Sequence, residues 1–135
     1  GLPVSLHDRN ATDEVLAILE EYSGRLAGVA HCFSGNAKQA RKYLALGFYL
    51  GVDGPVTYPK NDPLRQVLAS APANRLLVET DCPYLPPQEL RGKRNEPAYV
   101  ALVLAALAEV LGLPAGQLAE QTTRNAEKLF GVLQN

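Results

Sequence analysis

Short apolar runs alternate along the chain with longer stretches in which apolar residues recur at helical spacing. The short runs lie at residues 3–7, 28–33, 48–52 and 76–80. Each has the length of a β-strand, and each is followed by helical periodicity, which is the pattern of βα units around a parallel sheet. The hydrophobic pattern therefore predicts an α/β fold with four βα units.

Capping residues, prolines and glycines indicate where the helices begin and end. The first helix is expected to open near Thr12, and the second to begin after the cap Asn36 and to stop at Gly47. Asp62 as a cap, followed by Pro63, predicts the start of the third. The apolar stripe expected on the first helix consists of Val15, Leu16, Ile18, Leu19 and Tyr22.

The strongest helical pattern covers residues 97–111 and ends at Gly112. This helix is expected to cover the sheet, because its apolar positions form a broad stripe. A last pair of helices is predicted after Pro114, with Thr122 or Thr123 as a cap between them. The residues expected to point inward there are Ala126, Leu129 and Phe130.

Three of the four predicted strands end in a residue that can bind a metal ion: His7, His31 and Asp81. In parallel α/β folds the carboxyl ends of the strands open onto the functional face, so these side chains can converge. A lone histidine there is more often structural, and an aspartate before a turn is often a cap. The two histidines are, however, the only ones in the chain and share one topological position. Imidazole with carboxylate suits Zn²⁺ and other divalent ions.

Glu79 and Asp81 lie two residues apart in LLVETDCPY, so on a strand they would face the same way. A buried acid in this position can act directly in catalysis or can hold an Arg or His side chain. We favour the second role for Glu79, as a carboxylate that orients a metal ligand from behind.

A basic cluster, Arg91, Lys93 and Arg94, follows the fourth predicted strand and precedes a helix. Such a loop can bind phosphate, with help from amide groups at the helix N-terminus. It can equally be a solvated loop whose charges pair with Glu89 and Glu96.

Cys32 beside His31 permits a Cys–His nucleophile pair in principle. Adjacent strand residues point to opposite faces, so Cys32 is expected to face the helices when His31 faces the site. Cys32 and Cys82 also lack zinc-finger or CxxC spacing, and we expect both to be reduced packing residues.

Composition limits the possible functions only moderately. With 135 residues, of which 47% are hydrophobic and 20% charged, the chain can form one globular core. A net charge of -1 excludes a strongly basic surface, so any nucleic-acid affinity must come from a local cluster or a bound cation. No apolar run approaches the roughly 20 residues that cross a bilayer, so we expect a cytoplasmic protein without a membrane partner. The absence of methionine suggests an incomplete or processed chain.

Five motifs together resemble the TatD family of metal-dependent hydrolases, over essentially the whole chain. They are LPVSLHDR at residues 2–9, GVAHCFSGN at 28–36, LLVETDCPYLPP at 76–87, RGKRNEP at 91–97 and the tail TTRNAEKLF. The resemblance implies a TIM-type (β/α)₈ barrel that binds divalent cations, usually two, and cleaves phosphodiester bonds as a deoxyribonuclease. The ions would be Mg²⁺, Zn²⁺ or Mn²⁺.

By the same resemblance, His7 and His31 would hold one ion and Asp81 the other, with Asp81 also orienting the attacking water. Arg91, Lys93 and Arg94 would contact the phosphate of DNA or another phosphoester. The family's HxH motif and its bridging glutamate are not present in this sequence.

Residues 1–135 are therefore expected to form the C-terminal half of a barrel, with the N-terminal half missing, and to be weakly active or inactive alone. Four strands cannot close a barrel, so we expect Val4, Leu6, Val29, Leu50, Val52 and Leu77, or their alternates, to stay wet in a monomer. The missing half or a second copy would then cover the open edges. The alternative is a catalytically silent α/β module that binds phosphate or a protein partner.

Overall fold

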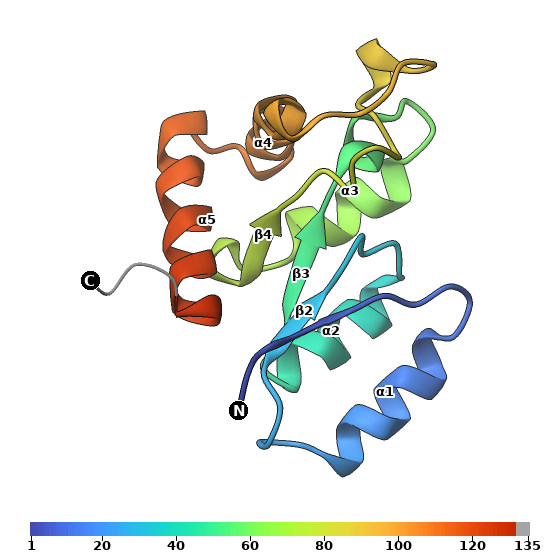
Figure 1. Ribbon diagram of the computed structural model, residues 1–135, viewed down its shortest axis with the longest axis vertical. Coiled ribbons are helices and arrows are strands. Elements are labelled where there is room, and N and C mark those ends of the chain that lie inside the picture. The colour runs from blue at the N-terminus through green and yellow to red at the C-terminus, as the bar shows by residue number, and fades with distance from the viewer. Residues whose placement is uncertain (132–135) are drawn as a thin grey trace.

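The computed structural model describes residues 1–131 and shows a four-stranded parallel sheet with the strand order β1-β2-β3-β4 (Figure 1). Residues 132–135, which the predicted unit includes, lie outside the described part. The strands are β1 (Val4–Leu6), β2 (Gly28–Ala30), β3 (Tyr49–Val52) and β4 (Leu76–Val78). The prediction of four parallel βα units is confirmed, although each strand is shorter than the apolar run that contains it.

Five α-helices accompany the strands in the described residues. They are α1 (Thr12–Glu21), α2 (Ala37–Ala45), α3 (Asp62–Ala69), α4 (Val100–Leu111) and α5 (Ala115–Phe130). Within residues 1–131 no single helix is long and apolar enough to cross a bilayer. Residues Pro97–Leu111 and α5 meet that criterion only together, as a pair bent by 109°.

The predicted helix boundaries are largely confirmed, and the details that differ lie at the start of α3 and in α5. Asn36 caps α2 with a complete capping box, because its side chain accepts from the amides of Lys38 and Gln39. In α3 the N-cap is Asn61, and Asp62 lies one position inside, where it pairs with Arg65 at 2.5 Å.

The predicted pair of helices after Pro114 is a single helix, α5. Thr122 does not cap, since its hydroxyl donates to the carbonyl of Leu118 inside the helix. Phe130 at the end of α5 is exposed.

The main hydrophobic core lies between the sheet and the helices. Its strand residues include Ala30, Leu50, Val52 and Leu76, and Val4 and Leu6 pack against it. In α1 only Leu16 and Leu19 are buried, whereas Ile18 and Tyr22 remain 57% and 44% exposed. The predicted stripe is wrong for these two, because α1 lies beside the edge strand and is covered on one side only.

The opposite face of the sheet carries a small second cluster formed by Val29, Tyr49 and Leu77. Ala126 and Leu129 of α5 pack against it, and α5 lies on the side of the sheet away from α1 and α2 (Figure 1). The expectation that Val29 and Leu77 stay wet is therefore wrong, because the final helix folds back over them. The other four residues named with them face the helical layer.

Candidate metal centre

The carboxyl ends of the four strands lie at one edge of the sheet, and backbone pairing continues to the candidate site. The amide of His31 donates to the carbonyl of Leu6 at 2.9 Å, and the amide of Glu79 donates to Val52 at 2.9 Å. Side chains that follow these bonds are therefore positioned by the sheet rather than by a free loop.

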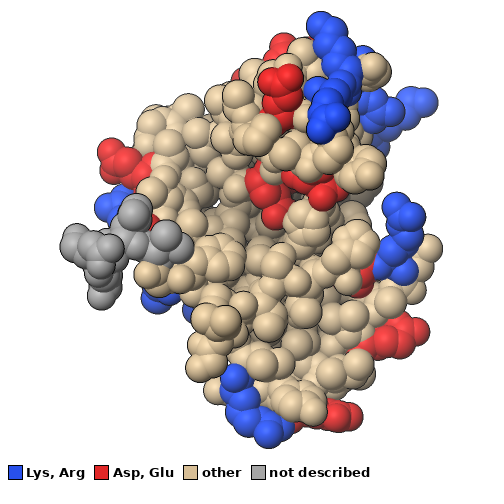
Figure 2. Space-filling model, viewed as in Figure 1, with Lys and Arg blue, Asp and Glu red and all other residues tan. Residues whose placement is uncertain are grey.

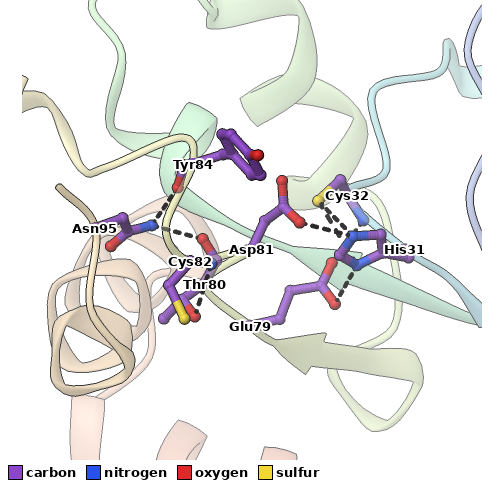
Figure 3. Close-up of polar contacts among 8 residues, drawn as sticks. All are labelled: His31, Cys32, Glu79, Thr80, Asp81, Cys82, Tyr84 and Asn95. Carbon is purple, nitrogen blue, oxygen red and sulfur yellow. Dashed lines mark hydrogen bonds and ion pairs between the residues drawn. The ribbon is translucent and has the colours of Figure 1, made fainter.

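His31 is held between two carboxylates (Figure 3). Its Nδ1 lies 2.8 Å from Oε2 of Glu79, and its Nε2 lies 3.2 Å from Oδ1 of Asp81. When Nδ1 carries the proton and donates to Glu79, Nε2 presents its lone pair toward Asp81, which is the form a metal ligand needs. The expectation that Glu79 bonds to an Arg or His side chain is confirmed for His31, although both side chains are half-buried, at 22% exposed, rather than fully buried.

Burial alone would lower the pKa of His31, but the hydrogen bond and charge of Glu79, followed by those of Asp81, outweigh it and raise the pKa above 6.5. An imidazole surrounded by two carboxylates attracts positive charge, either a proton or a metal cation. The site therefore favours a cation at Nε2.

Glu79 uses both of its oxygens, and the second one accepts from the backbone amide of Cys32 at 2.5 Å. The space for this carboxylate comes from Gly51 on the neighbouring strand. A Cβ at position 51 would come closer to Oε1 and to the carboxylate carbon of Glu79 than real Cβ atoms do, and it would be in tight contact with Oε2. Gly51 is thus a site residue that the sequence reasoning missed, and its position on β3, beside the strand β4 that Glu79 follows, was the available signal.

Cys32 faces the site, not the helices, so the prediction for its direction is wrong. Strand β2 ends at Ala30, and Cys32 has a φ of 48°, so strict strand alternation no longer applies when the chain reaches it. Its Sγ lies 3.2 Å from Nε2 of His31. Burial and then the carboxylate of Asp53 raise the pKa of the thiol far above its usual range, which argues against a Cys–His nucleophile.

Asp53 is a fourth strand-end residue that the sequence reasoning missed. It follows Val52 at the end of β3, and the same criterion that selected His31 and Asp81 could have found it. It is 2% exposed, and its Oδ2 has no hydrogen-bond partner among the described residues. Burial chiefly, together with the negative charge of Glu79 and Asp81, raises the pKa of Asp53 to about 6.

His7 lies near the centre but is held less firmly than His31. His7 is exposed. Its ring centroid is 6.0 Å from that of His31, and the two ring planes are tilted by 46°. It lines a cavity of about 690 Å³ with Asp8, Cys32 and Asp53. The structure therefore brings His7 beside His31 without a hydrogen bond that fixes the ring.

Asp81 is fixed by the loop that follows it. Its φ is 53°, a left-handed conformation that needs support from its surroundings. The side-chain amide of the buried Asn95 donates to the carbonyls of Thr80 and Tyr84, each at 2.6 Å, on either side of Asp81 (Figure 3). Asn95 in RGKRNEP is thus a structural clamp that sequence reasoning also missed.

The predicted phosphate-binding residues Arg91, Lys93 and Arg94 are all exposed, and none lines the cavity. Figure 2 shows basic side chains at the top of this face, above a hollow that contains acidic side chains. The guanidinium of Arg91 lies 4.6 Å from the centre of the Tyr58 ring. The structure thus places the basic loop at the rim of the site and not at the strand ends.

The donor set suits a divalent cation. One ligand atom each from His31, Cys32 and Asp81 lies within 4.8 Å of the others, and the buried Asp53, whose Oδ2 has no partner among the described residues, lines the same cavity as Cys32. Nitrogen, sulfur and carboxylate oxygen together are typical of first-row transition ions.

Comparisons with known proteins identify the family and the fold of this chain. A chain from the crystal structure of YjjV, a TatD homologue from Escherichia coli, superposes with a TM-score of 0.91 at 38% identity, covering 98% of this chain and 51% of that chain. YabD of Bacillus subtilis, named as an uncharacterized metal-dependent hydrolase, is 43% identical over 133 residues, which is 98% of this chain and 52% of YabD.

A Klebsiella pneumoniae protein named 3'-5' ssDNA/RNA exonuclease TatD is 40% identical over 138 residues, covering 98% of this chain and 52% of that protein. The chain thus spans about half the length of these relatives, and its α/β fold corresponds to half of their TIM barrel. The family model described as TatD related DNase matches residues 1–131. This chain belongs to the TatD-related DNase family.

Proposed function

We propose that this chain supplies part of the divalent-metal centre of a phosphodiester hydrolase that acts on DNA. The observation that carries the proposal is the geometry of His31: Glu79 binds Nδ1 at 2.8 Å and leaves Nε2 facing Asp81 at 3.2 Å. A purely structural histidine has no need of a second carboxylate at its free nitrogen. Relatives named metal-dependent hydrolase and exonuclease support the same reaction class.

His31 and Asp81 would hold an ion between them, and His7 lies close enough to contribute with a modest side-chain movement. The chemistry that a bound divalent ion supplies is polarisation of the phosphate and activation of water. Asp81 approaches the same nitrogen of His31 that an ion would use, so one ion can take both residues. The assignment of Asp81 to a second ion remains a prediction from the resemblance.

The residues of this chain would each have a separate task in hydrolysis. Glu79 fixes the tautomer and orientation of His31, and Asp81 is placed to orient water and accept its proton at a carboxylate oxygen. Arg91, Lys93 and Arg94 at the rim would draw in the DNA backbone from solution, because their charges are exposed and the site itself is acidic.

The proposed partner at the edge of β1 is the other half of a barrel. Strand β1 has a neighbour on one side only, and three exposed apolar residues, Leu2, Ile18 and Tyr22, lie in or beside its βα unit. A second copy of this chain is the alternative occupant. We propose a cytoplasmic location, where a DNA phosphodiesterase would meet its substrate.

Metal-dependent cleavage tests the proposal directly. Using the natural gene product and a fluorescent oligodeoxynucleotide, we expect cleavage with Mg²⁺, Mn²⁺ or Zn²⁺ and none after chelation. His31→Ala should lower the rate about 100-fold or more, as removal of catalytic metal assistance does. Gln66→Ala, an exposed change on α3, is the matched control and should leave the rate unchanged.

Cleavage that persists after chelation, or in His31→Ala, would contradict the metal mechanism. DNA or protein binding with no cleavage under any of these ions would favour the catalytically silent module.

A further inference from the structure

Cys32 and Asp81 approach the same nitrogen of His31. The distances to Nε2 are 3.2 Å from Sγ of Cys32 and 3.2 Å from Oδ1 of Asp81 (Figure 3). Ligand atoms bonded to one zinc ion at about 2.0–2.3 Å lie roughly 3–4 Å from one another. Both distances to Nε2 match this spacing, and Cys32 and Asp81 each offer a ligand atom within 4.8 Å of the other, so the three donors lie close enough to share one ion.

Hydrogen bonds to Glu79 fix the backbone that carries the Cys32 thiol. The amide of Cys32 donates to one oxygen of Glu79, and the other oxygen of Glu79 binds Nδ1 of His31. One carboxylate therefore fixes both the imidazole and the turn that directs Sγ toward it. The left-handed φ of 48° at Cys32 is part of that turn.

Asp53 gives an independent indication that a cation belongs beside the thiol. It is 2% exposed and lines the same cavity as Cys32. Its Oδ2 has no partner among residues 1–131. A buried carboxylate oxygen without a donor is unfavourable, and a cation or a water brought with it would satisfy that oxygen, whereas an anion would not.

We propose that Cys32 is a sulfur donor to the ion held by His31 and Asp81, and that it makes the site select Zn²⁺ or Co²⁺ over Mg²⁺. The inference rests on the proposed function, since it concerns the same ion. Thiolate sulfur is a soft ligand that favours Zn²⁺, whereas Mg²⁺ prefers oxygen. As the metal–sulfur bond forms, the S–H bond breaks and its proton passes to solvent, without oxidation or reduction.

The test is a metal titration of this chain, with Cys82→Ser as the matched control because Cys82 is exposed and lies outside the donor group. Co²⁺ should produce a sulfur-to-cobalt charge-transfer band in the near ultraviolet in the wild type and in Cys82→Ser. Cys32→Ser should lose that band. By calorimetry its Zn²⁺ affinity should fall at least about tenfold, with Mg²⁺ affinity changed by less than about twofold.

A second measurement uses the wild-type chain alone, so it does not depend on whether a variant folds. Zn²⁺ should slow the alkylation of Cys32 by iodoacetamide, measured by mass spectrometry, and leave the alkylation of Cys82 unchanged, while Mg²⁺ should protect neither. Equal alkylation rates with and without Zn²⁺ would overturn the proposal.

The outcomes separate this inference from the function on which it rests. If the cobalt band is absent and Cys32→Ser binds Zn²⁺ as tightly as the wild type while His31→Ala does not, the role of Cys32 is refuted and the metal centre stands. If the wild type binds none of these ions, both proposals fail.

Discussion

The two histidines occupy the same topological position but very different surroundings. His31 follows β2, which has strands on both sides, and its side chain is 22% exposed between Glu79 and Asp81. His7 follows the edge strand β1 and is exposed, and its ring centroid lies 6.0 Å from that of His31. The comparison shows that neighbouring strands, not the residue type, fix a ligand in this sheet. The β1 edge therefore lacks the neighbouring strand and carboxylates that fix the histidine in the β2–β4 region.

The largest expected difference is between His31→Ala and His7→Ala in metal binding by this chain. His31→Ala should weaken Zn²⁺ binding about 100-fold or more, because it removes a positioned ligand. His7→Ala should weaken it by about tenfold at most, because an unfixed ring contributes less after the entropy of ordering it. Calorimetric titration measures both affinities. Equal losses of Zn²⁺ affinity in the two variants would contradict the different roles of His31 and His7.

Gly51→Ala should disturb the surroundings of His31 and leave those of His7 unchanged. The added methyl meets the Glu79 carboxylate, so we expect the free energy of unfolding to fall by about 1–3 kcal/mol. The pKa of His31 should also move down toward its ordinary value, because Glu79 is the main group that raises it. Denaturant unfolding and an NMR pH titration measure the two effects.

Gly116→Ala is the control for Gly51→Ala, because nothing lies within 4 Å of a Cβ at position 116. This change in α5 should stabilise the protein by up to about 1 kcal/mol or leave it unchanged. If Gly51→Ala keeps wild-type stability and His31 titration, the space beside Glu79 is not needed for its position.

The exposed edge of β1 should also promote self-association of the chain. We expect this chain to self-associate, and Ile18→Asp should weaken the association about tenfold by placing a charge among the apolar residues beside β1. Ala101→Asp, an exposed change on α4, should have no effect. Sedimentation velocity measures both, and a wild type that stays monomeric at all concentrations would contradict an unsatisfied edge.

The smallest effect is expected at the basic rim. Replacing Arg91 and Arg94 together by Gln should weaken DNA binding severalfold and flatten its salt dependence, with metal content unchanged, because these residues are exposed and belong neither to the donor set nor to the cavity lining. Fluorescence anisotropy at several salt concentrations is the measurement. Unchanged affinity and salt slope would identify RGKRNEP as a solvated loop.

Local patterns in the sequence determined the elements of this protein. Short apolar runs alternating with helical spacing of apolar residues predicted four βα units, and Asn36 with Gln39 encoded the start of α2 within a single turn. These signals succeed because their physical causes act between residues that are close in sequence. The same logic placed Glu79 at the end of a strand, but it extended the strand too far for Asp81, because β4 ends at Val78 and Asp81 has a φ of 53°.

Only the tertiary structure decided how the site is assembled. The direction of Cys32 depends on its φ after the strand has ended, and the burial of Asp53 depends on segments far away in sequence. Glu79 meets the Cys32 amide across 47 positions of the chain, and α5 folds back to cover Val29 and Leu77. Such contacts follow from the packing of whole elements, so no local periodicity could predict that Cys32, Gly51 and Asp53 join His31 and Asp81 at one site.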